Sequence, residues 1–272
     1  MRPRAIGVIA SGANPVESLK LVKSLGLECC QLSVPAKEWF EEPKISEFKK
    51  ALEETGVTIV GYFCGFAGER YDDIPTIQQT VGLVVPATRD ERLQIVLDNS
   101  DWIAKLQAPA LLAHIGFVPE DYTDPTYAAV VSAIQQICDR CAKNGQDFGL
   151  ETGQETAAEL KQFISAVNRP NLKVNFDPAN MLLYGSGNPM EAVQLLREFV
   201  ISVHCKDGRW PTEAGQLGHE TPFGEGDVNV QAFLGFLKES NFTGPLIIER
   251  EISGEEQQRD IVRARDLIQG LR

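Results

Sequence analysis

The sequence predicts an α/β fold, a single (β/α)8 barrel (TIM barrel) that takes up residues 1–272. Short apolar segments alternate strictly with longer amphipathic segments, and eight such pairs fit into the 272 residues. Strands that alternate with helices form parallel sheets through right-handed crossovers. Eight such units in about 250 residues are the usual size of a closed barrel, which makes this the favoured architecture.

Each strand is expected at a short apolar run bounded by turn residues, and each helix where apolar residues recur every three or four positions. Residues 132–141 show this helical spacing, and Gly26, Gly56 and Gly145 mark helix ends shortly before a new strand. The expected strands are residues 5–10, 27–34, 57–63, 110–115, 148–151, 172–177, 201–205 and 246–249. The expected helices are residues 15–25, 43–55, 88–107, 124–143, 155–168, 189–198, 228–240 and 255–270.

The main competing fold is a doubly wound open sheet. Such a sheet usually carries a glycine-rich phosphate loop after its first strand, whereas here that turn reads Ser11-Gly-Ala-Asn14. Neither GxGxxG nor GxxxxGK[ST] occurs in the sequence, so we favour the closed barrel. Residues 64–87 and 206–227 are long loops at the barrel end that carries active sites, and both are candidate lids.

The composition is that of an acidic globular protein. Lys and Arg number 26 against 38 Asp and Glu, which gives a formal net charge of −12. This charge suits neither a nucleic acid backbone nor an anionic membrane, so we expect neither as a partner. No apolar run approaches the roughly 18 residues of a membrane helix, and we expect the start of the chain to be a strand rather than a signal peptide. The six dispersed cysteines are expected to be reduced, in a cytoplasmic protein.

Polar side chains stand at the C-terminal ends of four successive expected strands. Side chains alternate between the two faces of a strand, and the neighbours Phe176, Val203 and Ile248 have the apolar character of residues that face the helices. The polar residues have the opposite parity, so we expect them to point into the barrel. They are Glu151, Asp177, His204 and Glu249.

Three carboxylates and an imidazole on a barrel axis predict a metal site. Buried like charges repel and lose hydration, at a cost of several kcal/mol per ion unless something compensates. A set of three oxygens and one nitrogen without thiolate suits one Mn²⁺, Mg²⁺ or Co²⁺ ion, with Zn²⁺ as a further alternative, and we expect Mn²⁺ first. In the competing interpretation, each acid caps the following helix or pairs with Lys206 or Arg250.

With this residue set, the chain resembles the xylose isomerase-like superfamily of (β/α)8 barrels, in the branch of sugar and sugar phosphate isomerases and epimerases. The resemblance covers essentially the whole chain. The matching segments are Leu150-Glu-Thr-Gly-Gln-Glu155, Asn175-Phe-Asp-Pro-Ala-Asn180, Val203-His-Cys-Lys-Asp207, Gly224-Glu-Gly-Asp-Val-Asn229 and Ile248-Glu249.

The resemblance implies that Glu151, Asp177, His204 and Glu249 hold one metal ion and that Glu151 and Glu249 also act as an acid/base pair. It implies an isomerase or epimerase of a sugar, sugar acid or related ketone, with a small carbohydrate as substrate. One glutamate would remove a proton from the carbon beside the carbonyl, giving a metal-stabilised enediolate. The other would return a proton to the opposite face or to the adjacent carbon.

The chain departs from the ketose 3-epimerases of this family at two positions. Asn180 stands where they carry a substrate-binding histidine, and Trp210 stands where they carry a substrate-binding arginine, although Arg209 is adjacent. Lys206 is expected either to hold an acidic or phosphorylated group or to bridge to a carboxylate. His114 ends the fourth strand and is the remaining candidate for substrate contact, so the substrate-binding candidates are His114, Asn180, Lys206 and Arg209.

Two other functions remain as alternatives. The same enediolate could expel a β-hydroxyl group, as in the inosose dehydratases of this superfamily, and the barrel could be a sugar-binding protein without catalysis. Apurinic endonucleases share the barrel but use a histidine-rich cluster of three zinc ions, and this acidic chain has three histidines in all. The sequence shows no readable subunit interface, so a homo-oligomer stays an open alternative to a monomer.

Overall fold

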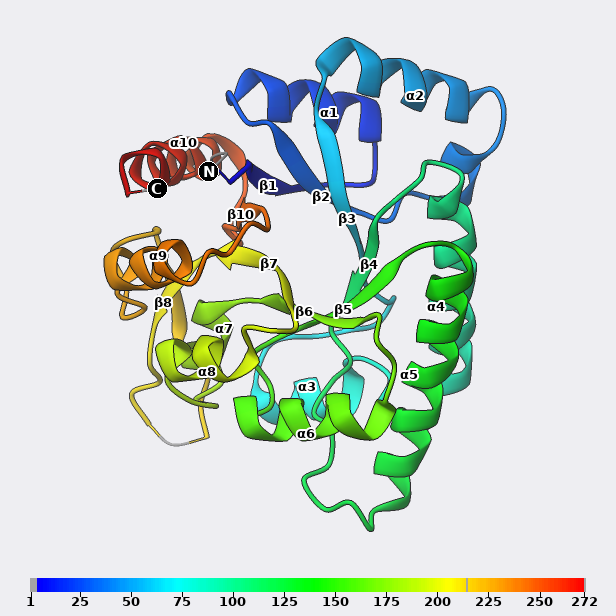
Figure 1. Cartoon of the computed structure of the whole chain (residues 1–272), viewed down its shortest axis with the longest axis vertical. Helices are drawn as coiled ribbons and strands as arrows, with labels where there is room; N and C mark the ends of the chain where they lie inside the picture. The colour runs from blue at the N-terminus through cyan, green and yellow to red at the C-terminus, as the bar shows by residue number, and fades with distance from the viewer. Residues whose placement is uncertain (1–3, 214, 272) are drawn as a thin grey trace.

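The computed structural model describes residues 4–213 and 215–271, and in this part of the chain eight parallel strands close into a barrel. Around the barrel they run in the order β1, β10, β7, β6, β5, β4, β3, β2, so that the last strand pairs with the first (Figure 1). The strands are β1 (Ile6–Ala10), β2 (Cys29–Ser33), β3 (Thr58–Cys64), β4 (Ala110–Ala113), β5 (Asp147–Glu151), β6 (Leu172–Phe176), β7 (Val200–Cys205) and β10 (Leu246–Ile248). The predicted (β/α)8 architecture is thus confirmed.

A helix occurs at every position where the sequence predicts one. Capping residues explain several of the starts: the Asn14 side chain accepts from the backbone N–H of Glu17, and Thr156 forms a reciprocal capping box with Glu159. The helices surround the barrel and bury their apolar faces against it (Figure 1). They are α1 (Pro15–Ser24), α2 (Lys44–Thr55), α4 (Arg89–Ala104), α5 (Pro125–Lys143), α6 (Ala157–Val167), α8 (Pro189–Leu196), α9 (Val230–Glu239) and α10 (Gly254–Leu271).

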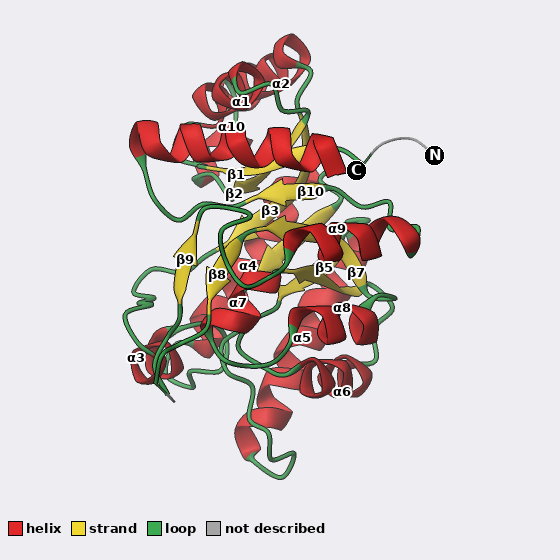
Figure 2. Cartoon of the chain, turned by 90° about the vertical axis from the view of Figure 1, so that its left-hand side faces the viewer, coloured by secondary structure: helices red, strands yellow, loops and turns green. Residues whose placement is uncertain are grey.

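Short elements that the sequence analysis did not predict lie in the loops. The 64–87 loop contains α3 (Ile74–Thr80), and the 206–227 loop contains a hairpin of β8 (Asp207–Arg209) and β9 (His219–Thr221), which lies outside the barrel (Figure 2). Two further pieces are the 3₁₀ turn Lys37–Phe40 and helix α7 (Pro178–Leu183). Elements of three to seven residues are too short for hydrophobic periodicity to reveal.

The interior of the barrel is filled by side chains from alternating positions. Leu112 on β4 occupies the space between two inward glycines, and a Cβ built on Gly149 would come within 2.5 Å of its side chain. Strand pairing sets the next layer: Glu151 lies beside Asn175, and His204 lies beside Ile247. Polar inward residues therefore collect toward the C-terminal end of the barrel.

All six cysteines lie among the described residues, and each is a buried free thiol. Burial raises the pKa of the Cys138 thiol to about 12 and that of the Cys141 thiol to about 11, so both stay protonated at neutral pH. No described helix combines the length and the apolar character needed to cross a membrane.

Asp207, the first residue of β8, holds the loop that leads into α9. Its buried carboxylate accepts four backbone N–H groups, those of Gly208 (2.8 Å), Val228 (3.1 Å), Gly224 (3.0 Å) and Gly226 (3.0 Å). Gly226 must be glycine for this approach, because a Cβ there would lie 2.2 Å from the carboxylate oxygen. The glycine motif seen in the sequence is thus the partner of Asp207.

We predict that Asp207→Asn lowers the free energy of unfolding by about 2–4 kcal/mol, because the amide nitrogen would face two backbone donors that now bind an oxygen. Urea denaturation followed by circular dichroism should show a lower midpoint with an unchanged slope. Asp227→Asn on the same loop is the control: its carboxylate meets one backbone N–H, of Trp210, at 3.4 Å. Equal stability of the two variants would contradict the role assigned to Asp207.

Candidate metal centre

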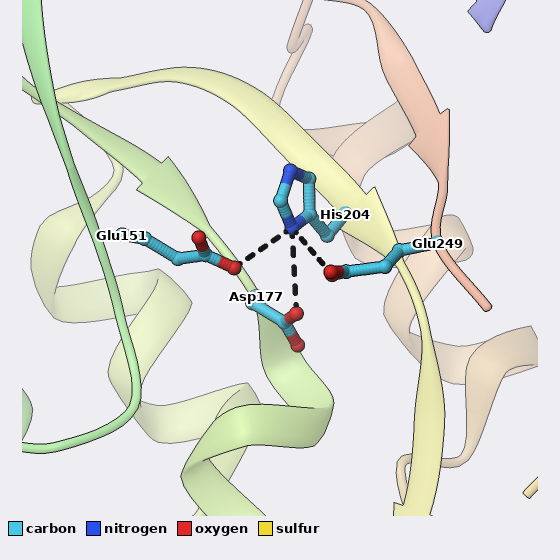
Figure 3. A group of neighbouring side chains, drawn as sticks. All are labelled: Glu151, Asp177, His204 and Glu249. Carbon is cyan, nitrogen blue, oxygen red and sulfur yellow. Dashed lines mark ion pairs between the residues drawn. The ribbon is translucent and has the colours of Figure 1, made fainter. Parts of the chain in front are cut away.

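Four side chains from four neighbouring strands meet at the C-terminal end of the barrel (Figure 3). Glu151 ends β5, Asp177 follows β6, His204 lies in β7 and Glu249 follows β10. The Nδ1 atom of His204 lies 3.0 Å from a Glu151 oxygen, 3.4 Å from an Asp177 oxygen and 2.9 Å from a Glu249 oxygen. The structure therefore brings together all four residues that the sequence analysis proposed as metal ligands.

The atoms that face one another in this cluster lack ordinary partners. Asp177 Oδ2, His204 Nδ1 and Glu249 Oε2 are buried atoms without a hydrogen bond of acceptable geometry. Asp177 uses its other oxygen, Oδ1, to accept the backbone N–H of Asn180 and so caps α7. Helix capping, the competing interpretation of the acids, therefore explains the position of Asp177 Oδ1. It does not explain Asp177 Oδ2, which points into the cluster without a partner.

A divalent cation fits this donor set. One ligand atom from each residue lies within 4.8 Å of the others, and ligands about 2.1 Å from an octahedral ion lie about 3 Å apart. Three buried oxygens and one nitrogen without thiolate are the donors that Mg²⁺ or Mn²⁺ accept readily, and Zn²⁺ also binds them. A cation would satisfy the three unpartnered atoms and offset the repulsion among the carboxylates.

A buried polar network beneath the cluster orients His204. Its Nε2 atom lies 2.8 Å from Oε1 of Gln31 on β2 and 2.8 Å from Nδ2 of Asn175 on β6. Gln31 donates to the Asn175 oxygen at 2.9 Å and to Ser202 at 3.1 Å, which fixes its own amide. Nε2 therefore has both an acceptor and a donor as neighbours. When Nε2 carries the proton, Gln31 accepts it, and the lone pair of Nδ1 points at the cluster.

The charges of the cluster keep the imidazole basic. Burial lowers the pKa of His204, but the negative charges of Glu151 and Glu249 outweigh it, and the pKa lies well above its ordinary value. Without a bound cation, the imidazole is therefore protonated and serves as a partial counter-ion to the carboxylates. A metal ion must displace this proton, because Nδ1 can bind it only with a free lone pair.

Lys206 lies two residues beyond His204 and has a side chain that is 1% exposed. Its Nζ donates to Glu251 Oε1 at 2.6 Å and to Asn180 Oδ1 at 3.0 Å, and lies 3.5 Å from a Glu249 oxygen. Burial lowers its pKa, but the surrounding carboxylates raise it well above the ordinary value, so the group stays an ammonium ion. Of the two roles expected for Lys206, the structure realises the bridge to a carboxylate.

The other predicted substrate-binding residues have different positions. His114 Nε2 lies 3.2 Å from a Glu151 oxygen, and Asn180 donates to the other Glu151 oxygen at 3.2 Å, so both stand beside the cluster. Arg209 is exposed on β8 and donates to the backbone carbonyl of Glu225. His114 and Asn180 thus face the site, whereas Arg209 is held by the outer loop.

A cavity of about 380 Å³ opens onto the cluster. Its wall includes Glu151, Glu249, His114 and Asn180, together with aromatic side chains from both sides, Phe63, Tyr71 and Tyr184. Tyr71 comes from the 64–87 loop and Leu217 and Gly218 from the 206–227 loop, so both loops proposed as lids contribute to the wall.

Sequence reasoning missed Gln31 and the second glutamate of the last strand end, Glu251. The sequence does single out Gln31, because it is a polar residue inside an otherwise apolar strand segment. It also singles out Glu251, because that residue shares its parity with Glu249. It does not single out Tyr71, because the place of this residue over the cavity depends on how the 64–87 loop folds.

We predict that Gln31→Met weakens the binding of Mn²⁺ by about 10- to 100-fold, because His204 loses the acceptor that holds its Nε2 proton. Isothermal titration of the metal-free protein with Mn²⁺ measures this directly. Gln94→Met, an exposed change on α4, should bind Mn²⁺ like the wild type. Wild-type affinity in Gln31→Met would show that the network does not orient the imidazole for a metal.

Residues 19–270 match the sequence profile of a family described as xylose isomerase-like TIM barrel. The crystal structure of a xylose isomerase domain protein from Planctomyces limnophilus is 39% identical, covers 100% of this chain and 98% of its own, and superposes with a TM-score of 0.95. An L-ribulose-5-phosphate 3-epimerase of Salmonella paratyphi C is 22% identical over 96% of this chain and 90% of its own length. The D-psicose 3-epimerase of Clostridium cellulolyticum H10 is 17% identical, with a TM-score of 0.73 over 98% of this chain and 99% of its own, which shows the shared fold alone.

Proposed function

The chain belongs to the family of xylose isomerase-like TIM barrels, and from this membership we propose that it is a divalent-metal-dependent isomerase or epimerase of a sugar, sugar acid or related ketone. One observation supports the proposal above all others. Two glutamates, Glu151 and Glu249, approach the same buried point from opposite sides, at the bottom of a cavity (Figure 3). The sugar epimerases among the relatives support the same class of reaction.

The proposed metal ion is held by Glu151, Asp177, His204 and Glu249, with Mn²⁺ as the first candidate. When bound, it supplies Lewis acidity, which polarises a carbonyl group and makes the neighbouring C–H more acidic. Asp177 and His204 have no further task in this scheme beyond holding the ion. The finer choice among Mn²⁺, Mg²⁺, Co²⁺ and Zn²⁺ is decided by reconstitution of the metal-free protein with each ion.

Glu151 and Glu249 are the proposed acid/base pair. One carboxylate removes the proton from the carbon beside the carbonyl, which leaves an enediolate, and the other delivers a proton. Delivery to the opposite face of the same carbon inverts it, and delivery to the adjacent carbon moves the carbonyl. His114 and Asn180 each contact Glu151 and so hold its carboxylate in place.

We expect Mn²⁺-loaded protein to exchange deuterium into a ketose at the carbon beside the carbonyl, and EDTA to abolish this exchange. NMR in D₂O against a panel of ketoses, keto-sugar acids and inososes identifies the labelled carbon and separates epimerase from isomerase. Loss of water from the substrate would instead identify a dehydratase. Metal binding without exchange or product on any member of the panel would speak for a sugar-binding barrel.

Substitution of the acid/base pair provides the second test. Glu151→Gln and Glu249→Gln should each lower turnover by at least about 100-fold, because an amide cannot transfer the proton. Each amide keeps an oxygen for the metal, so Mn²⁺ titration of the variants separates lost chemistry from lost metal. Glu53→Gln, an exposed change on α2, is the matched control. Wild-type turnover in either site variant would overturn the assignment.

A further inference from the structure

The charged groups that line the cavity are nearly all acidic. Glu151 and Glu249 lie at the bottom, and Glu220 and Glu251 belong to the same wall. Among the residues that the structure describes, no lysine or arginine side chain lines this cavity. A charged substrate would therefore meet carboxylates on its way to the site, with the imidazole of His114 as the nearest basic group in the wall.

Among the described residues, Lys206 and Arg250 each pair with a glutamate that lines the cavity. Lys206 is buried and donates to Glu251 at 2.6 Å and to Asn180 at 3.0 Å. Arg250 donates to Glu220 at 2.7 Å and to Asp260 at 2.9 Å, with 11% of its side chain exposed. Either cation would have to give up an ion pair to contact a ligand in the cavity, in the case of Lys206 a pair with Glu251, whose side chain is 57% exposed.

Phosphate groups are normally held in proteins by Arg, Lys or clustered backbone N–H groups. Hydroxyl groups, by contrast, form hydrogen bonds with carboxylates, amides, other hydroxyls and imidazoles. The cavity wall offers this second kind of partner in Ser33, His114, Asn180 and Tyr184, besides the glutamates. Aromatic faces such as Phe63 suit the C–H face of a sugar.

We propose that the substrate is an uncharged, unphosphorylated keto-sugar or polyol-derived ketone, and that the pairing of Lys206 with Glu251 excludes phosphate esters from the site. This inference rests on the proposed function, since it names the substrate class of the same site. The proposed substrate class also differs from the substrate in the name of the Salmonella paratyphi C relative, an L-ribulose-5-phosphate 3-epimerase.

The direct test compares ligands that differ by one phosphate. Isothermal titration of Mn²⁺-loaded protein with L-ribulose and L-ribulose 5-phosphate, and with D-fructose and D-fructose 6-phosphate, measures the discrimination. We expect the free ketose of at least one pair to bind about tenfold or more tightly than its ester, because like charges oppose one another in the cavity. Tighter binding of the esters, or binding of neither member of any pair, would overturn the proposal.

Deuterium exchange on the same pairs keeps the two proposals separate. If free ketoses bind more tightly than their esters but no exchange occurs, the proposed function fails and the substrate class stands. If the esters are the better substrates for metal-dependent exchange, the substrate class fails and the function stands. The same protein and ligand samples serve for both the titration and the exchange measurement.

A variant tests the part played by the ion pair. Glu251→Gln removes the charge that holds Lys206 and should narrow the preference for free ketose over ester by about tenfold, because the ammonium ion can then face a phosphate. Glu256→Gln, an exposed change on α10, should leave the preference unaltered. Mn²⁺ titration of both variants checks that the metal centre is intact. An unchanged preference in Glu251→Gln would show that the pair does not set the charge selectivity.

Discussion

Mutual repulsion among buried carboxylates is the constraint that organises the upper end of this barrel. Glu151, Asp177 and Glu249 converge within a few ångströms of the single imidazole of His204. Isolated carboxylates would leave such a place or take up protons. They stay because closed strand pairing holds their backbones, and because Lys206 and the imidazole supply part of the missing positive charge. The remaining deficit is what a divalent cation would fill.

Successive residues at the end of β7 and the start of β8 make contacts with different parts of the structure. His204 points inward to the carboxylates, and Lys206 on the same face binds Glu251 and Asn180 above it. Cys205 between them is buried in the core that surrounds the barrel, and Asp207 secures the glycine-rich loop before α9. Strand alternation thus gives the site its ligand and its counter-charge while the intervening residues fasten the scaffold.

The acidic side chains of the cavity wall also bear on whether the site can bind a phosphorylated substrate. One relative is named for L-ribulose 5-phosphate and a structural neighbour for D-psicose, so similarity to them does not say whether the substrate of this chain carries a phosphate. Under the proposal above, this distinction comes from charged residues in the cavity wall. Glu251 and Glu220 line the cavity, and each pairs with a basic side chain, Lys206 and Arg250 respectively.

The sequence by itself determined the barrel, the order of its strands along the chain and the side of each strand on which the polar residues stand. These properties are local, because helix and strand periodicity and the parity of Glu151 or His204 depend on neighbours in the chain. Long-range packing decided the rest. The hairpin β8–β9, the place of Tyr71 over the cavity, and the partners of Gln31 and Lys206 each depend on contacts between segments far apart in sequence. The contact between Lys206 and Glu251 also required the folded chain, because the two residues are far apart in sequence and lie within hydrogen-bond distance only there.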